Sequence, residues 1–524
     1  MSLMIKPGME WKNVEAEVKA LIPEAYDSSG KPLNLIKGEW SSPGWGKHSL
    51  SPIDGTGLAT FPMLGLDEAR EATEFAAREF IDWKRVDLDE RKRRVTAVLA
   101  GMKKHRDLFA KILVWEIGKT FSTAQTSVDR CISGVEWYVE NIESMVIGRE
   151  PIGLISNIAS WNYPLSVLFH AVLVQLLAGN SVIAKTPSDG GLTCLTLAFA
   201  LARREKLPVS LVSGSGGQLS DALVKNNAIA CLAFVGGKSN GGVIAASLYD
   251  QNKRYMLEME GVNAYGVWDF SQWDLFKQHL KKGYEYGKQR CTAYVRYVVQ
   301  RDLFPKFLDA YLSVVKTIRV GNPVLVGNEK EPLPSYDFGP VINAKKVEEL
   351  RVRFSEAVGK GATCLFESAL QRENFLPNQD IASYFLPTAL LNVPRNCELY
   401  HSEPFGPIDT IVVVDRVEEL AGEMNASNGS LVATIASDNP AVSQRIRSES
   451  RAFKVGVNAL RSRGDREEPF GGRGNSWRGC FVGGKYLVES VTTGEPGEKL
   501  FGIFPDYTRI PDEIAAAETV SKKG

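Results

Sequence analysis

The middle of the chain, from Ile152 to Asp269, alternates between short apolar runs and longer segments with apolar residues every three or four positions. A short apolar run predicts a buried β-strand, and the longer spacing predicts an amphipathic helix. Strands that alternate with helices are typical of a doubly wound parallel sheet, which binds ligands at the carboxyl ends of its strands. The expected strands are 152–156, 181–185, 209–213, 231–235 and 255–259, and the expected helices are 164–178, 191–205, 217–225 and 239–250.

A second alternation of this kind runs from Ser271 to about Asn458 and predicts a second α/β unit. Its expected helices are 272–284, 303–317 and 344–358, and its expected strands are 294–299, 363–366 and 410–414. The N-terminal part predicts short strands with turns at 36–40 and 51–55, a helix capped by Asp67 that ends at Trp83, and helices at 89–118 and 122–143.

Composition excludes several classes of protein. Lys+Arg and Asp+Glu both number 62 in the 524 residues, so the zero net charge favours neither nucleic acid nor an anionic membrane as a partner. The seven cysteines are scattered and include no C-x-x-C pair, so we expect no disulfide framework and no metal site. We see no signal peptide and no apolar stretch of about 20 residues, and we therefore expect a cytoplasmic protein.

Three polar residues are candidates for catalysis. Cys291 lies in the stretch 287–293, just before an apolar run, and is a candidate nucleophile, although a single cysteine is more often buried and inert. Glu258 ends an expected strand and suits a general base for water; a surface salt bridge is the alternative. Asn162 lies between a strand and a helix, where its amide can donate to an oxyanion or simply cap the helix.

Two turns are candidates for binding a nucleotide. Lys185 closes a strand and is followed by hydroxyl groups and by Asp189, a set that suits ribose or phosphate. Gly236 and Gly237 open a helix, where backbone amides can approach a pyrophosphate. The chain has no G-x-G-x-x-G in the required strand–turn–helix setting and no Walker A motif, so neither turn is diagnostic by itself.

Together these segments resemble the NAD(P)-dependent, non-acylating aldehyde dehydrogenase superfamily. Six or more motifs occur in the family's order between about Gly38 and Thr492. The matching motifs are 160–164 (Ser-Trp-Asn-Tyr-Pro), 185–188 (Lys-Thr-Pro-Ser), 234–237 (Phe-Val-Gly-Gly), 258–261 (Glu-Met-Glu-Gly), 289–291 (Gln-Arg-Cys), 403–407 (Glu-Pro-Phe-Gly-Pro), 457–458 (Val-Asn) and 470–472 (Phe-Gly-Gly).

The resemblance implies the chemistry of the site. Cys291 would attack the aldehyde carbonyl to form a thiohemiacetal, while Asn162 and the Cys291 backbone N–H hold the oxyanion. Hydride would pass to NAD(P)+, and Glu258 would activate the water that releases the acid from the resulting thioester. The residues implied for cofactor binding are Ser160, Trp161, Lys185, Ser188, Asp189, Gly216, Phe234, Gly236, Gly237, Met259, Glu403 and Phe405.

Some positions depart from the family pattern. Glu260 replaces a glycine beside the catalytic carboxylate, so it either points away, perturbs that carboxylate or occupies nicotinamide space. Gly237 replaces a serine, and Thr186 looks like an insertion. Asp189 can accept a ribose hydroxyl, which slightly favours NAD over NADP.

Three arginines are candidates for substrate binding. Arg290 precedes the nucleophile, and Arg461 and Arg463 lie in the segment that lines the substrate mouth in relatives. Because guanidinium pairs with carboxylate or phosphate, they indicate an anionic aldehyde such as a semialdehyde, unless they are solvated surface groups. An acylating enzyme that transfers the thioester to coenzyme A and a non-catalytic member of the fold are the alternative functions, and Glu258 argues against the first.

The resemblance also implies a Rossmann-type cofactor domain, a second α/β catalytic domain and a small oligomerisation element. We expect the dinucleotide-binding domain at 30–130 and 151–257, and the catalytic domain at 258–460. We expect the oligomerisation element and C-terminal arm at 131–150 and 483–524, in a homodimer or homotetramer, because an exposed strand edge needs covering.

Overall fold

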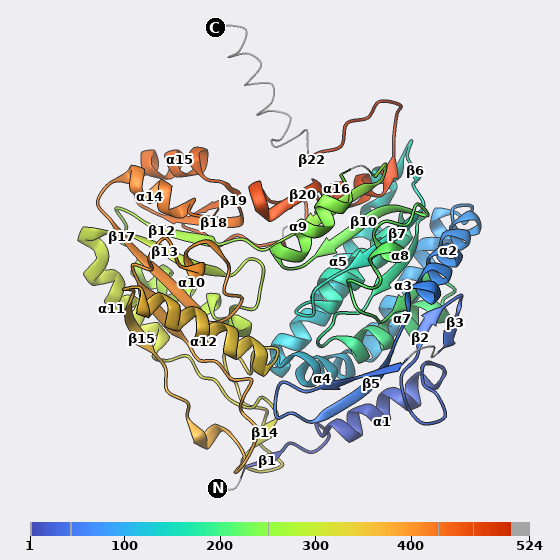
Figure 1. Cartoon of the computed structure of the whole chain (residues 1–524), viewed down its shortest axis with the longest axis horizontal. Helices are drawn as coiled ribbons and strands as arrows, with labels where there is room; N and C mark the ends of the chain where they lie inside the picture. The colour runs from blue at the N-terminus through green and yellow to red at the C-terminus, as the bar shows by residue number, and fades with distance from the viewer. Residues whose placement is uncertain (1–2, 42–44, 250, 428, 465, 505–524) are drawn as a thin grey trace, which may run out of the picture.

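Two large β-sheets form the framework of the computed structural model, which describes residues 3–41, 45–249, 251–427, 429–464 and 466–504. In this described part, one sheet has nine strands and lies mostly in the right half of Figure 1, and the other has seven strands and lies in the left half. The nine-stranded sheet uses 34–258 and 477–503, and the seven-stranded sheet uses 263–457. The fold is therefore α/β, as the alternation predicts.

The nine-stranded sheet has the order β22-β20-β11-β10-β7-β8-β9-β2-β3, and its five central strands, β11 to β9, are parallel. Every residue of β8 is buried. Burial on both faces explains why these strands appear in the sequence as continuous apolar runs. The strands are β2 (Asn34–Ile36), β3 (Glu39–Ser41), β7 (Leu154–Ile158), β8 (Ser181–Lys185), β9 (Val209–Val212), β10 (Ile229–Val235), β11 (Arg254–Glu258), β20 (Trp477–Cys480) and β22 (Gly502–Ile503).

Helices cover both faces of this sheet (Figure 1). On one face, Ala72 of α2 and Leu223 of α8 pack with Leu154 and Ile183. The opposite face is covered by α3, α5, α6 and α7, whose apolar residues form the main core with the other side of the strands. The helices are α2 (Leu66–Trp83), α3 (Leu88–Lys104), α4 (Arg106–Ile117), α5 (Phe121–Val146), α6 (His170–Leu177), α7 (Leu192–Arg204), α8 (Ser220–Leu223) and α9 (Lys238–Ser247).

The seven-stranded sheet has the order β15-β16-β17-β13-β12-β18-β19, and all its strands except β15 are parallel. Its strands are β12 (Asn263–Val267), β13 (Tyr294–Gln300), β15 (Thr363–Glu367), β16 (Thr388–Leu391), β17 (Ile408–Val414), β18 (Ser430–Ala436) and β19 (Ala452–Val457). Its helices are α10 (Trp273–Gly283), α11 (Phe304–Val315), α12 (Ala344–Gly359), α14 (Val417–Met424) and α15 (Pro440–Glu449).

The remaining elements are short or peripheral. They are α1 (Trp11–Leu21), α13 (Glu398–His401), α16 (Lys485–Ser490), the hairpin β4 (Trp45–Leu50) and β5 (Gly57–Met63), and the strand pairs β1 (Met4–Ile5) with β14 (Leu325–Val326) and β6 (Glu150–Pro151) with β21 (Thr492–Thr493). Within the described residues, the helices are all too short or too polar to cross a bilayer.

The two sheets meet at the turn between Glu258 and Asn263. Glu258 is the last residue of β11 in one sheet, and Asn263 is the first residue of β12 in the other. The C-terminal segment then returns to the first sheet, where Trp477 of β20 pairs with Glu258 in antiparallel register. This junction therefore places the carboxyl end of a parallel strand of the first sheet next to the second unit.

Several details of the N-terminal half differ from the sequence prediction. The single helix expected at 89–118 is two helices, because the chain breaks at His105 (φ −109°). Asp67 is not an N-cap but lies in the first turn of α2, where its charge favours the helix dipole. The residues expected as a strand at 51–55 form the loop of the β4–β5 hairpin.

Candidate active site

Cys291 follows a stretch of unusual backbone. Tyr286, Gly287 and Lys288 all have positive φ, at 59°, 59° and 58°. L-residues adopt this left-handed conformation only when surrounding contacts hold them in it. The hydroxyl of Tyr286 donates to the carbonyl of Ile117 at 2.9 Å, so part of that support comes from the end of α4.

Lys288 also holds this left-handed backbone in place. Its ammonium forms an ion pair with Asp409 of β17, and both side chains are fully buried. The hydroxyls of Tyr284 and Tyr311 each donate to the same carboxylate at 2.7 Å. The Lys288 ammonium also donates to the carbonyl of Tyr294 at 2.9 Å. The residues before Cys291 are thus anchored to the second sheet.

Two amide side chains fix the backbone on either side of the cysteine. Gln289 donates to the Pro340 carbonyl at 3.3 Å and accepts from the Ile342 amide at 3.0 Å. Asn263, at the sheet junction, donates to the carbonyls of Cys291 and Ala293 at 2.8 and 2.9 Å. The thiol is therefore held in place through its own backbone.

Cys291 and Glu258, which the sequence places in different units, meet at the junction. Glu258 is 2% exposed, and Cys291 is partly exposed. Burial raises the pKa of the Cys291 thiol well above its usual value, and the charge and hydrogen bonding of the Glu258 carboxylate raise it further. The nearby Arg463 guanidinium opposes this rise, and it forms an ion pair with Glu258.

Asn162 lies next to the cysteine loop. Its side chain is 5% exposed and donates through Nδ2 to the carbonyl of Gln289 at 3.0 Å. The Ser160 hydroxyl donates to Asn162 Oδ1 at 2.7 Å, which fixes the orientation of the amide. A carboxamide nitrogen carries two hydrogens, so the second can serve an oxyanion. Ser160, expected as a cofactor residue, therefore positions Asn162.

A cavity of about 440 Å³ opens in front of Cys291. Its walls come from α5, η2 (Pro164–Phe169), α6, α10, α16, residues 460–464 and Arg466. None of the lining residues that the structure describes carries a carboxylate. The cations in its wall are Arg130, Lys282, Arg290, Arg461, Arg463 and Arg466. The concentration of positive charge predicts that the cavity favours an anion.

The arginines of this wall have different partners. Arg461 forms an ion pair with Glu468, and Arg290 donates to the Gly283 carbonyl at 3.0 Å. Arg466 donates to the Ser133 hydroxyl at 2.8 Å. Sequence reasoning singled out 290, 461 and 463 but missed Arg130, Lys282 and Arg466. Arg130 lies on a helix far away in sequence, whereas Lys282 is close to Cys291 in the chain and Arg466 is close to 461 and 463, so both could have been found from their spacing.

The cofactor side of the junction contains the two glycines expected from the sequence. Gly236 donates its amide to the Glu258 carbonyl at 3.0 Å, and Gly237 is the N-cap of α9. A side chain at Gly237 would meet nothing within 4 Å, so the helix N-terminus is open to an anion. Lys185 is buried at the end of β8, which lowers its pKa to about 8.

Glu403 lies in a narrow cleft with Glu260 and Lys238. Burial and the charge of Glu260 raise the pKa of Glu403 well above its usual value, although the charge of Lys346 opposes that rise. Within the described residues, neither carboxylate oxygen of Glu403 has a hydrogen-bond partner. Such an unsatisfied buried group suits a ligand hydroxyl, and together with the open α9 terminus it fits a nicotinamide dinucleotide. Glu260 lines this cleft and not the cavity in front of Cys291.

Aromatic and apolar residues of the expected cofactor set pack around this region. The rings of Trp161 and Phe405 meet edge to face with centroids 5.8 Å apart, and Phe405 has a φ of 48°. Phe234 and Met259 are buried in one apolar cluster. Gly216 lies in an exposed turn after β9.

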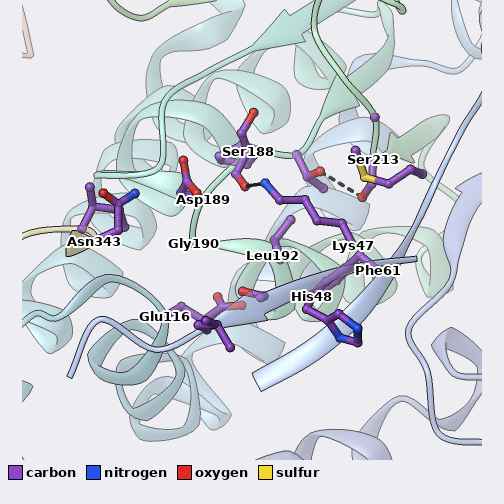
Figure 2. A pocket seen from close by; sticks show the side chains of 17 residues that line it. Lys47, His48, Phe61, Glu116, Ser188, Asp189, Gly190, Leu192, Ser213 and Asn343 are labelled. Carbon is purple, nitrogen blue, oxygen red and sulfur yellow. Dashed lines mark hydrogen bonds between the residues drawn. The ribbon is translucent and has the colours of Figure 1, made fainter. Parts of the chain in front are cut away.

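Figure 2 shows a second cavity, of about 200 Å³, beside the turn after β8. Ser188 and Asp189 line it together with Lys47 and His48 of the β4–β5 hairpin. The Lys47 ammonium donates to the Ser188 carbonyl. The nearby charge of Lys47 adds to the effect of burial on the pKa of Lys185, whereas Asp189 opposes it. Lys47, Lys185 and Asp189 therefore act on one another at this turn, and the buried Glu116 also lines the cavity.

The model of the aldehyde dehydrogenase family matches residues 44–494, and the chain belongs to that family. It is 27% identical to the mitochondrial succinate-semialdehyde dehydrogenase of Rattus norvegicus, over 84% of each chain. It is 26% identical to the 3-sulfolactaldehyde dehydrogenase of Pseudomonas putida, over 88% of this chain and 95% of the other. These findings confirm the family that the motifs indicate.

Solved structures confirm the fold. The NADP-dependent glyceraldehyde-3-phosphate dehydrogenase of Bacillus halodurans C-125, complexed with NADP, has a TM-score of 0.79 at 24% identity, over 88% of this chain and 98% of that one. The betaine aldehyde dehydrogenase of Staphylococcus aureus, in complex with NAD+, has a TM-score of 0.80 at 21% identity, over 93% and 98%. The chain is an oxidoreductase of the class that oxidises aldehydes with NAD(P)+.

The opposing effects of Glu258 and Arg463 on the thiol can be measured by alkylation. Glu258→Gln should lower the pKa of Cys291, because it removes the negative charge that raises it, and Arg463→Met should raise that pKa. Since only the thiolate reacts, iodoacetamide should modify Cys291 several-fold faster in Glu258→Gln and several-fold slower in Arg463→Met at one fixed pH near 8. Equal rates in all three proteins would show that neither group acts on the thiol.

Proposed function

We propose that this enzyme oxidises an aldehyde that carries an anionic group to its carboxylic acid, with Cys291 as nucleophile, Glu258 as general base and Asn162 as oxyanion donor. The observation that carries the proposal is the cavity in front of Cys291, whose wall contains six cations. Guanidinium groups bind carboxylate, phosphate and sulfonate through charge-assisted hydrogen bonds. The names of two relatives, a succinate-semialdehyde and a 3-sulfolactaldehyde dehydrogenase, support an anionic substrate.

The first half of the reaction needs a proton acceptor beside the thiol. Because the pKa of Cys291 is raised, the thiol is protonated at neutral pH, and Glu258 is placed to take its proton. The sulfur then attacks the carbonyl carbon, and the electron pair of the C=O π bond moves to oxygen. Asn162 Nδ2–H and the Cys291 backbone N–H can donate to that oxyanion.

Oxidation of the thiohemiacetal carbon leaves a thioester on Cys291. This step requires a hydride acceptor, which the nicotinamide cofactor supplies when it is bound. Gly237 and Lys185 would hold its phosphate and ribose groups, and Glu403 would accept a hydroxyl.

Hydrolysis completes the cycle. Glu258 accepts a proton from water, the water oxygen attacks the thioester carbonyl, and the C–S bond breaks to return the Cys291 thiolate. Asn162 again stabilises the oxyanion. The buried carboxylate beside Cys291 favours hydrolysis over transfer of the acyl group to coenzyme A, and it also disfavours a non-catalytic role.

The turn after β8 bears on the choice of coenzyme, and we propose that NAD+ is favoured over NADP+. A carboxylate at this place accepts a ribose hydroxyl and repels a 2′-phosphate, which is the role we give Asp189. Lys47 offsets part of that repulsion, because its ammonium reaches the Ser188 carbonyl (Figure 2).

The division into units also remains a proposal. We assign 30–130 and 151–257 to cofactor binding, 258–460 to catalysis, and 131–150 with 483–504 to oligomerisation. The pairing of β6 with β21 supports the last assignment, because it joins those two segments. The rest of the expected arm, 505–524, lies outside the described residues.

Matched aldehydes test the proposed substrate class. Succinate semialdehyde and butanal have the same chain length but differ in terminal charge. A hydrogen-bonded charge contributes about 1.5–3 kcal/mol, so kcat/KM should be roughly 10- to 100-fold higher for the charged aldehyde. The difference should shrink in Arg290→Met. Equal values for the two aldehydes in the unaltered enzyme would remove the proposal.

Two single substitutions test the proposed coenzyme preference. The ratio of kcat/KM for NADP+ to that for NAD+ should rise in Asp189→Asn, because the repulsion of the 2′-phosphate is lost. The same ratio should fall in Lys47→Met, because a compensating cation is lost. The assignment of this turn fails if neither substitution changes the ratio.

A further inference from the structure

Arg463 connects the substrate cavity to the candidate general base. Its side chain is 27% exposed and lines the cavity in front of Cys291, whereas its ion-pair partner Glu258 is 2% exposed. The guanidinium lies over the ring of Phe470, with its carbon 5.2 Å from the ring centroid. One end of the pair is thus accessible from the cavity, and the other is buried beside the thiol.

The ion pair engages one of the two carboxylate oxygens of the candidate general base. Arg463 Nη1 donates to Glu258 Oε2. Glu258 Oε1 is buried and is not held by Arg463, so it can take the proton of the adjacent thiol. Water for hydrolysis must instead come from the cavity, which Arg463 lines and the buried Glu258 does not. The resting ion pair therefore places the guanidinium between the water of the cavity and the carboxylate.

The other arginines of the cavity wall do not hold the base in this way. Arg461 is paired with Glu468 and Arg290 with Glu285, and Arg466 donates to Ser133. Among the described lining residues, Arg463 is the cation whose ion-pair partner is Glu258. Its two possible partners, Glu258 and an anionic substrate, compete for one guanidinium.

We propose that Arg463 is a positioning residue that releases Glu258 when an anionic acyl group is bound to Cys291. The substrate anion takes over the guanidinium, water enters the place that the guanidinium leaves beside Oε2, and Glu258 accepts the proton of the water that attacks the thioester. The C–S bond then breaks, and the Cys291 thiolate leaves. A neutral acyl group does not displace Arg463, so it stays on Cys291 longer. The inference rests on the proposed anionic substrate. According to it, the enzyme selects charged substrates during hydrolysis of the acyl-enzyme as well as during substrate binding.

Two esters of equal length separate acylation from hydrolysis without any coenzyme. The 4-nitrophenyl ester of butyric acid is neutral, and mono-4-nitrophenyl succinate carries a terminal carboxylate. The burst of nitrophenolate counts Cys291 thiols that become acylated, and the steady rate reports hydrolysis of the acyl-enzyme. The burst also shows that each variant is folded and reactive.

In the unaltered protein, the succinyl-enzyme should be hydrolysed about ten-fold faster than the butyryl-enzyme, because one charged hydrogen bond contributes about that factor. Arg463→Met should raise the steady rate with the butyrate ester and lower it with the succinate ester. Arg463→Lys, which keeps a shorter cation, should give intermediate rates. As a matched control, Arg461→Met removes a cation of the same wall that is paired elsewhere, so it should slow the succinyl-enzyme without accelerating the butyryl-enzyme.

Free propionate supplies a carboxylate that is not attached to the acyl group on Cys291. It should accelerate hydrolysis of the butyryl-enzyme in the unaltered enzyme, and this activation should be absent in Arg463→Met. If Arg463→Met does not speed the butyryl-enzyme, or if propionate does not activate, the release mechanism is wrong. In that case a retained preference for charged aldehydes leaves the proposed function standing. If charged and neutral aldehydes are oxidised equally while propionate still activates, the substrate proposal fails and the release mechanism survives.

Discussion

The buried ion pair between Lys288 and Asp409 is the contact on which the placement of Cys291 depends. Removing one partner of such a pair typically costs about 3–5 kcal/mol, because the other charge stays buried. That penalty is comparable with the cost of the left-handed backbone at Tyr286 and Lys288, which is on the order of 1–3 kcal/mol for each of these two residues. The second sheet, through Asp409 on β17, therefore dictates where the thiol lies.

The first sheet supplies the groups that act on this thiol. Glu258 ends the parallel strand β11, and Asn162 follows β7, which lies on the other side of β10, so both lie at the edge where such sheets bind ligands. Asn263, a few residues after Glu258, bonds to the cysteine backbone and couples the two sheets. Catalysis is thus confined to the junction, and the charges of the cavity wall reach it through Arg463.

The sequence predicts those parts of the molecule in which one local pattern decides the outcome. Strands buried on both faces, such as β8, are recognisable as apolar runs, and the motifs around Cys291 and Glu258 identify the family. The prediction nevertheless omits β12, β18 and β19, although every residue of β12 and β18 is buried. Likewise, Arg130 joins the cavity because α5 packs near it, and the pair of Arg463 with Glu258 spans distant segments. Such contacts follow from topology, which residue spacing does not encode.

The covalent intermediate on Cys291 is the most direct test of this account. Glu258→Gln lowers the pKa of the Cys291 thiol, so the thiolate can form without that base. The variant should therefore form the thioester from an aldehyde and NAD+ but hydrolyse it slowly, and the acyl group should accumulate. Peptide mass spectrometry after acid quench should find one acyl group on the peptide that contains Cys291, and none on the peptide that contains the exposed Cys364. An unmodified Cys291, or an acyl group on another cysteine, would contradict the account.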